Sequence, residues 1–166
     1  MNDCPRQNPA YRPTPFFEYS HTEPITFQIM NKRPQIVISS LDADRLEQLL
    51  DSLPSGAFPG KAALEAELAR AEIVEPQQIP ATVVTMNSTV RFRVESSPDE
   101  FTLTLVYPKD MDASSQKISI LAPVGSALLG LSTGDVIEWP KPGGGVLQVR
   151  IEEVVYQPER AGEFYR

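Results

Sequence analysis

The chain has 166 residues and a net charge of −7, and 41% of its residues are hydrophobic and 22% charged. The composition is that of a soluble globular protein, and the length is enough for one domain and a small appendage. Its only cysteine and only histidine, Cys4 and His21, exclude disulfides, cysteine zinc clusters and a Ser-His-Asp triad, so we expect no metal, cofactor or catalytic group. No apolar run approaches the roughly 20 residues that span a bilayer, so we expect a cytoplasmic protein that does not bind membranes. No segment is a basic patch, so we expect a protein partner and no sequence-specific binding of nucleic acid.

Residues 1–33 form a proline-rich opening segment. Its five prolines lie between Pro5 and Pro24, and its apolar residues follow neither helical nor alternating spacing. Such a composition cannot bury enough apolar surface to fold, so we predict a disordered tail. Met30 stands just before the first patterned segment and is the alternative to Met1 as the start of the physiological product.

Residues 34–75 predict a short strand followed by a helical hairpin. The β-branched run Gln35–Ser40 is typical of one strand. In Asp42–Leu53 the leucines recur at i, i+3, i+4 and i+7, the spacing of one helical face, and Asp42 is the expected N-cap. These leucines are Leu46, Leu49, Leu50 and Leu53.

A second helix is predicted in Lys61–Glu72 after the loop Pro54–Gly60, because the leucine pattern repeats there. Lys61 and Glu65 have the i, i+4 spacing of a surface ion pair. Two short helices joined by a tight loop form an antiparallel hairpin in which each helix buries its leucines against the other.

Residues 76–166 predict a sheet that follows a linker with two prolines. Apolar and polar residues alternate there, so each strand is expected to bury one face, and we expect the strands to form an antiparallel sheet. The predicted strands are residues 89–94, 101–107, 117–121, 135–139 and 146–156.

The last strand has a shift in its apolar pattern across Glu152 and Glu153, which predicts a β-bulge or a change of exposed face. Adjacent residues of a regular strand point to opposite faces. We therefore expect these two carboxylates to be separated and unable to work as a general acid and base.

A short helix is predicted to start at Pro123 and to lie across the sheet. Val124, Leu128 and Leu131 have helical spacing, and Gly130 and a later glycine can end the helix and turn the chain. The fold class is therefore α+β, a short helical hairpin followed by an antiparallel sheet around one short helix.

Four motifs, in this order, resemble the Gre transcript-cleavage-factor family, in the branch of the regulators of nucleoside diphosphate kinase. They are TVVTMNSTVRFR, TLVYP, APVGSALLGLSTGDVIEWPKPGG and VVYQPERAG. The resemblance extends from about Arg33 to the C-terminus. It implies an N-terminal coiled-coil hairpin (34–75) and an FKBP-like C-terminal domain (76–166) that docks at the rim of the RNA polymerase secondary channel.

The family's docking loop has the pattern Ser/Ala-Pro-Val/Ile-X-X-Ala/Gly-Leu, which this chain matches from Ala122 to Leu128. The resemblance implies that Pro123 and its neighbours face the polymerase. The alternative is that these residues only cap and pack the helix. The candidate partner-binding residues are Ala122, Pro123, Val124, Gly125, Ser126 and Leu128.

The hairpin departs from the family's cleavage factors, which have longer hairpins with acidic tips that help to hold Mg²⁺. A helix of 12 residues, Asp42–Leu53, extends only about 18 Å. The loop Pro54–Gly60 contains no acidic residue, and the nearest one, Asp51, is interpreted as a solvated helix residue. The candidate tip residues are Asp51, Pro54 and Phe58.

These observations favour a monomeric, non-enzymatic regulator that binds RNA polymerase, competes with Gre factors and affects the level of nucleoside diphosphate kinase. One alternative is an FKBP-like prolyl isomerase or ligand-binding domain, in which Trp139 would line a pocket. The other is an adaptor that acts directly on nucleoside diphosphate kinase.

Overall fold

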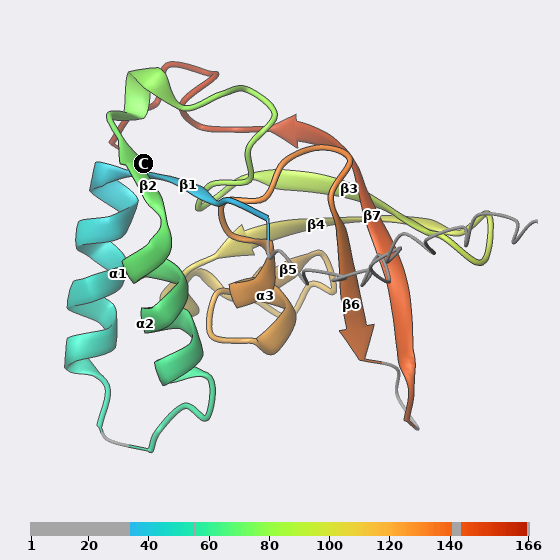
Figure 1. Ribbon diagram of the computed structural model, residues 1–166, viewed down its shortest axis with the longest axis horizontal. Coiled ribbons are helices and arrows are strands. Elements are labelled where there is room, and N and C mark those ends of the chain that lie inside the picture. The colour runs from blue at the N-terminus through green and yellow to red at the C-terminus, as the bar shows by residue number, and fades with distance from the viewer. Residues whose placement is uncertain (1–33, 55, 141–143, 166) are drawn as a thin grey trace, which may run out of the picture. The chain divides into compact units, whose positions relative to one another are not determined.

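The computed structural model describes residues 34–54, 56–140 and 144–165, which form an α+β fold (Figure 1). The predictions made for residues 1–33, a disordered tail and an alternative start at Met30, lie outside the described residues. None of the described helices has the length and the hydrophobicity that a transmembrane span requires. The α+β class expected from the sequence is confirmed.

The N-terminal part begins with β1 (Val37–Ser39), which leads directly into α1 (Ser40–Ser52). The N-cap of α1 is Ser39, whose hydroxyl accepts the backbone N–H of Asp42 at 3.1 Å. The prediction that Asp42 is the N-cap was therefore wrong. Because Ser39 caps the helix, α1 begins at Ser40, and Asp42 lies in the first helical turn with its side chain buried.

The second helix, α2 (Lys61–Arg70), lies beside α1 (Figure 1). The leucine pattern is confirmed, because Leu46 and Leu50 on α1 and Leu64 on α2 are each no more than 2% exposed. Lys61 and Glu65 form the expected i, i+4 ion pair, with 3.8 Å between nitrogen and oxygen.

The hairpin is completed by a strand that the sequence pattern did not reveal, β2 (Glu72–Val74). It pairs in parallel with β1, with Val37 opposite Glu72, and a short 3-10 turn, η1 (Pro76–Gln78), follows. A run of three residues is too short for an alternation pattern to be recognised. The predicted second helix was therefore extended to Glu72, and Ile73 and Val74 were assigned to no element.

The C-terminal part is built on a five-stranded sheet in the order β5-β4-β3-β7-β6. Three of its four pairings are antiparallel, but β4 and β5 pair in parallel, so the expectation of an antiparallel sheet was wrong at this edge. The chain leaves β4, makes the 3-10 turn η2 (Pro108–Asp110) and crosses back before it enters β5 in the same direction as β4. The strands are β3 (Thr89–Val94), β4 (Glu100–Val106), β5 (Lys117–Ser119), β6 (Val136–Pro140) and β7 (Val146–Tyr156).

The inner face of this sheet carries the predicted apolar residues. Val90, Phe92 and Val94 are buried, while Arg91 and Arg93 between them are exposed. Trp139, which is partly buried, contacts Phe92 and Phe101 edge to face, with ring centroids 6.0 and 5.3 Å away. Trp139 is thus packed against the core.

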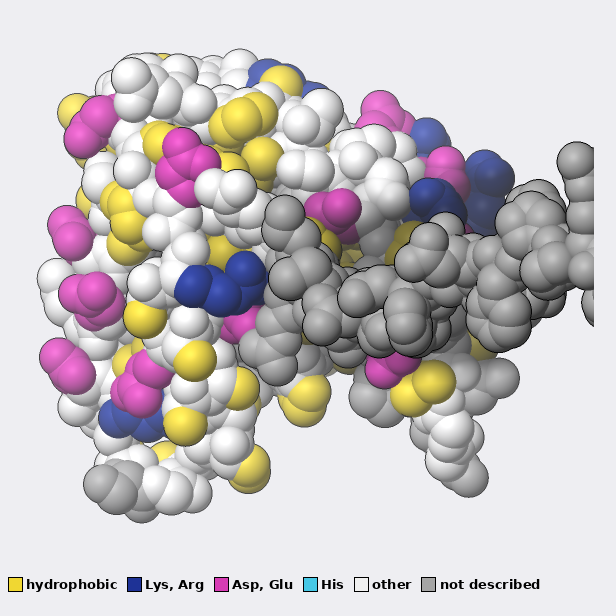
Figure 2. Space-filling model, in the orientation of Figure 1, with side chains coloured by type: hydrophobic (Ala, Val, Ile, Leu, Met, Phe, Trp, Pro, Cys, Tyr) yellow, Lys and Arg dark blue, Asp and Glu magenta, His cyan; other side chains and the backbone are white. Residues whose placement is uncertain are grey.

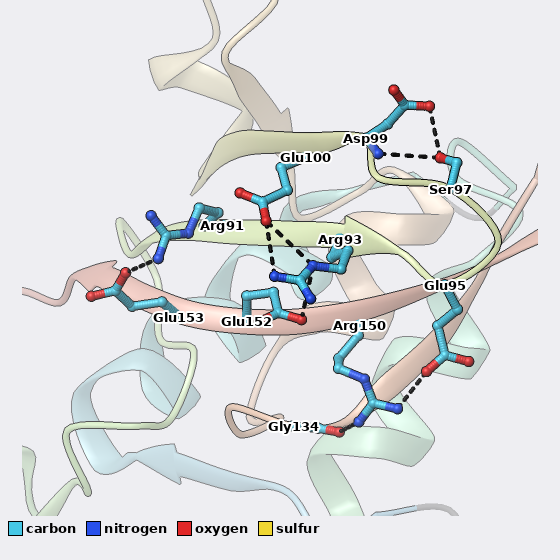
Figure 3. A network of polar contacts seen from close by, with 10 residues as sticks. All are labelled: Arg91, Arg93, Glu95, Ser97, Asp99, Glu100, Gly134, Arg150, Glu152 and Glu153. Atoms are coloured by element: carbon cyan, nitrogen blue, oxygen red, sulfur yellow. Dashed lines mark hydrogen bonds and ion pairs between the residues drawn. The ribbon is translucent and has the colours of Figure 1, made fainter.

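The bulge predicted in β7 is present, as a register shift opposite β3 that leaves Glu152 unpaired between Ile151 and Glu153. Because of this extra residue, Glu152 and Glu153 lie on the same face of the sheet (Figure 3), where they form ion pairs with Arg93 and Arg91. The expectation that the two carboxylates lie on opposite faces was therefore wrong. The alternation rule fails at the position of the bulge.

The short helix α3 (Pro123–Leu128) begins at Pro123, as predicted, and lies beside β5 and β6. Val124, Leu128 and Leu131 are buried, as their spacing indicated. Gly130, just after the helix, has a φ of 76° and lies so close to β1 that an added Cβ would be 2.6 Å from the Cβ of Ile36. Its N–H donates to Val84 and its carbonyl accepts from Val37, so this glycine joins the hairpin to the sheet.

Candidate functional site

The turn that leads into α3 is held by a set of local hydrogen bonds. Ala122 is the N-cap of α3, and the N–H of Ala122 donates to the Ser119 carbonyl at 2.9 Å. Ser126 closes the first turn of the helix, because its N–H donates to the Ala122 carbonyl at 2.9 Å and its hydroxyl to the Pro123 carbonyl at 3.0 Å. Pro123 has no N–H to satisfy and fits the first helical position. The surface of this turn is therefore rigid.

Gly125 fixes the position of this turn against the sheet. A Cβ on this glycine would be 2.0 Å from the carbonyl oxygen of Ser119 and 2.8 Å from its carbonyl carbon. Both atoms belong to the backbone at the end of β5, which cannot rotate away as a side chain could. Only glycine allows α3 to approach β5 this closely.

The six candidate partner-binding residues divide into an exposed and a buried set. Pro123 is exposed, and Ala122 and Ser126 are partly exposed. Val124, Gly125 and Leu128 are buried. We call Ala122, Pro123 and Ser126 the docking edge, since these three residues of the candidate set are accessible to a partner.

The candidate tip residues lie around the loop between the two helices. Asp51 and Pro54 are exposed, whereas Phe58 is partly buried and packs against the core cluster. Nowhere in the described ranges do three or more His, Cys, Asp or Glu side chains come together as a metal site. Figure 2 shows acidic side chains spread along the helical hairpin, where they remain separate from one another.

A buried carboxylate, which the sequence reasoning missed, connects the hairpin to the sheet. Asp42 accepts hydrogen bonds from the Met86 N–H and from the Tyr107 hydroxyl, both at 3.2 Å. Burial raises the pKa of Asp42 above its ordinary value, although these hydrogen bonds and the one at Ser39 oppose the rise. Burial and the neighbouring Asp42 charge also raise the pKa of Tyr107. The local pattern around Asp42 predicts a cap residue and contains no signal for this buried role.

A second acidic residue lies close to this carboxylate. Glu159, beyond the end of β7, accepts a hydrogen bond from the Thr85 hydroxyl at 2.7 Å, and Thr85 also contacts the Ser88 hydroxyl at 2.9 Å. Burial raises the pKa of Glu159, the Thr85 hydrogen bond opposes this, and the charge of Asp42 raises it further. Two acids therefore hold protons more tightly here than they would in water.

A groove of about 1130 Å³ lies between α1 and the outer face of the sheet. Arg45, Gln48 and Leu49 line it from α1. Thr89 and Thr104, on paired strands, line it from the sheet, together with residues of η2 and the C-terminal segment. We call it the α1–sheet groove. Sequence reasoning did not find it, because its residues come from segments that are far apart in the chain and share no spacing.

Two family models match this chain, and they divide it between hairpin and sheet. Residues 34–74 match the model described as "Rnk N-terminus". Residues 79–156, which include the docking edge, match the model described as "Transcription elongation factor, GreA/GreB, C-term". The fold and these two matches place the chain in a class of proteins whose C-terminal part is related to the GreA/GreB transcription elongation factors.

Similar whole proteins specify the branch. The chain is 46% identical over 132 residues to the "Regulator of nucleoside diphosphate kinase" of Escherichia coli K12, covering 80% of this chain and 97% of the relative. It is also 37% identical to "Transcription elongation factor GreA" of Methylobacterium sp. 4-46, over 49% of this chain and 52% of that protein. The chain belongs to the family of regulators of nucleoside diphosphate kinase, related to the GreA/GreB factors through its C-terminal part.

A solved structure of high sequence identity is similar over most of the chain. It is the "Prokaryotic transcription elongation factor GreA/GreB from Nitrosomonas europaea", 75% identical, with a TM-score of 0.68 over 74% of this chain and 99% of that chain. The resemblance predicted from the four sequence motifs is thereby confirmed at the level of the family.

Proposed function

We propose that this protein is a monomeric, cytoplasmic, non-enzymatic regulator that binds RNA polymerase at the rim of its secondary channel. In this proposal it excludes Gre-type cleavage factors from that site and so affects transcription and the level of nucleoside diphosphate kinase. The observation that carries the proposal is a short hairpin without acidic residues in its loop, fixed to a sheet domain of the Gre type.

The docking edge supplies the proposed contact with the polymerase. Ala122, Pro123 and Ser126 are accessible, and local hydrogen bonds and the close packing of Gly125 hold them in one conformation. A rigid exposed turn loses little conformational entropy on binding, which favours affinity. In the proposal the FKBP-like character of this domain, implied by the family resemblance, positions the turn.

The hairpin supplies the second part of the proposal, occupation of the channel without chemistry. The 13 residues of α1 extend about 20 Å along its axis. A catalytic Mg²⁺ requires oxygen ligands at the tip, usually carboxylates, and the loop Pro54–Gly60 contains none. Asp51 is the nearest acid, one turn below the loop. A coiled-coil hairpin of this kind would block the entrance to the channel without hydrolysing RNA.

The proposal is tested by measuring binding to core RNA polymerase and transcript cleavage in backtracked complexes. We expect Pro123→Ala to weaken binding about fivefold, since this residue is the exposed centre of the docking edge. Pro80→Ala, at an exposed proline outside the edge, is the matched control and should bind like the unmodified protein. The protein alone should not stimulate cleavage, and it should reduce the cleavage stimulated by a Gre factor. Strong cleavage by the protein alone, or no binding to polymerase, would refute the proposal.

Direct action on nucleoside diphosphate kinase is the second candidate, because the relative that is similar over nearly its whole length is named for that enzyme. Co-purification of the kinase, but not of polymerase, from cell extract would favour it. A prolyl isomerase has less support, since Trp139 packs against Phe92 and Phe101 and does not line the α1–sheet groove. A peptide isomerisation assay without acceleration would dispose of it.

A further inference from the structure

The α1–sheet groove is positively charged on an acidic protein. Three cations line it, Arg45, Lys109 and Lys117, against the one carboxylate of Asp110. The chain as a whole has 15 Lys and Arg against 22 Asp and Glu. Two of these cations have partners. Lys117 pairs with Asp112, with 2.6 Å between nitrogen and oxygen, and Arg45 lies near the Asp42 carboxylate and donates to the Tyr165 carbonyl. The groove is thus a local site where an anion is favoured.

The neighbouring part of the same sheet face is different, because its arginines are neutralised. Thr89 lines the groove, and by strand alternation Arg91 and Arg93 share its face of β3. The arginines in Figure 3 each contact glutamate: Arg91 with Glu153, Arg93 with Glu100 and Glu152, and Arg150 with Glu95. Lys109 has no acidic partner in the part of the chain that the structure describes, and its ammonium lies 5.9 Å from the centre of the Tyr107 ring.

Polar groups in the groove also have unused hydrogen-bonding capacity. The carboxamides of Gln48 and Asn87 make no hydrogen bond to other described residues. Thr89 and Thr104 share one hydrogen bond at 2.9 Å, which leaves one of the two hydroxyl protons for another acceptor. Asn87 has a φ of 61°, in the left-handed region that asparagine adopts more often than most residues other than glycine.

Aromatic rings form a further part of the wall. Tyr156 and Tyr165 line the groove, and Tyr165 is 83% exposed. The main chain of Tyr165 is fixed, because its carbonyl accepts a hydrogen bond from Arg45 at 2.9 Å. A large aromatic residue that is exposed at the rim of a groove is well placed to stack on a flat ligand.

From these features we infer that the α1–sheet groove binds a small phosphorylated molecule that carries an aromatic ring, of the nucleoside diphosphate class. The phosphates would contact Lys109 and its neighbouring cations, and the ring would stack on Tyr165. The edge of the base and the sugar hydroxyls would bond to Asn87 and Gln48. The groove volume of about 1130 Å³ is large enough for such a ligand. This inference is independent of polymerase binding, since the groove does not include the docking edge.

The test is a titration of the full chain with ADP, with adenosine and with inorganic phosphate. Calorimetry measures the affinity, and backbone amide NMR locates the binding site. ADP should bind more tightly than either fragment, because only ADP uses the cations and the ring together. Lys109→Ala should weaken ADP binding about tenfold and Tyr165→Ala about fivefold. Tyr165→Ala keeps the carbonyl that Arg45 binds, and Asn87→Gly keeps the positive φ while it removes the carboxamide.

Arg70→Ala is the control, since it also removes one positive charge but lies on α2, outside the groove. It should bind ADP like the unmodified protein. The amide shifts caused by ADP should centre on Asn87, Lys109 and Tyr165. No saturable binding of ADP at millimolar concentration, equal binding of phosphate alone, shifts centred elsewhere, or equal weakening by Arg70→Ala would each overturn the inference.

Discussion

Asp42 joins the hairpin to the sheet at the scale of one residue. Its carboxylate satisfies the buried N–H of Met86 and the hydroxyl of Tyr107, which come from segments more than 40 residues away. Buried donors without a partner cost free energy, so the acceptor cannot be removed without a loss of stability. The same burial makes the ionised form of Asp42 unfavourable.

Asp42→Asn should change the pH dependence of stability. The folded-state pKa is raised, so the folded protein retains this proton to a higher pH than the unfolded chain does. The free energy of unfolding should therefore fall as the pH rises from about 4 through the folded-state pKa. In Asp42→Asn this fall should be smaller, with a remainder from Glu159, whose pKa is also raised. Urea denaturation between pH 4 and 7 measures it, and Asp44→Asn, exposed on the same helix, is the control that should retain the full fall.

Gly125→Ala should destabilise the protein by about 2 kcal/mol, a typical cost of forced overpacking. The added methyl group would lie 2.0 Å from the backbone carbonyl oxygen of Ser119, so α3 or the end of β5 must move. Thermal denaturation measures the loss. Ala127→Ser, at an exposed position of the same helix, should change stability by less than about 0.5 kcal/mol. Equal stability of Gly125→Ala and the unmodified protein would show that the turn is not rigid.

At the scale of the element, α2 is attached to the rest of the protein mainly through one side chain. Leu64 is fully buried, while the other residues of this helix are partly or fully exposed. Isolated helices of ten residues are not stable in water, so α2 depends on this contact and on β2, which follows it. The stability of α2 therefore comes from its packing against α1 and the core.

Leu64→Ala should lower the free energy of unfolding by about 3 kcal/mol, since it leaves a cavity in the core. Leu68→Ala, at a partly buried position one turn later, should cost only about 1 kcal/mol. Amide hydrogen exchange should become faster throughout α2 in the first variant. Similar losses in both variants would contradict the single-contact interpretation.

The hairpin and the sheet share one core, which makes the described part of the chain a single unit. Leu46 and Leu64 of the hairpin belong to the same buried cluster as Phe92 and Ile151 of the sheet. Gly130 and Asp42 add hydrogen bonds between the two parts. A continuous core in a chain of this size favours one cooperative transition.

Denaturation by urea should therefore give the same midpoint by two probes. Trp139, the only tryptophan of the chain, reports on the sheet through its fluorescence, and far-ultraviolet circular dichroism reports mainly on the helices. In Leu46→Ala, a substitution in the hairpin, both midpoints should shift together. Two separate transitions would mean that the hairpin unfolds on its own.

The sequence alone determined the features that depend on local spacing. The leucines of α1, the alternation in β3, the start of α3 at Pro123 and the position of the bulge in β7 were all predicted, because each pattern is contained in a few consecutive residues. The family was also predictable, because four motifs retain their order along the chain.

The tertiary structure decided what depends on residues that are distant in the sequence. It brought the carboxylate of Asp42 within hydrogen-bond distance of Met86 and Tyr107. It also paired β5 in parallel with β4, and it placed Glu152 and Glu153 on one face of the sheet. It also assembled the α1–sheet groove from segments that are far apart in the chain. The physical reason is that burial and pairing partners belong to the packed chain, and local spacing contains no information on which segments will meet.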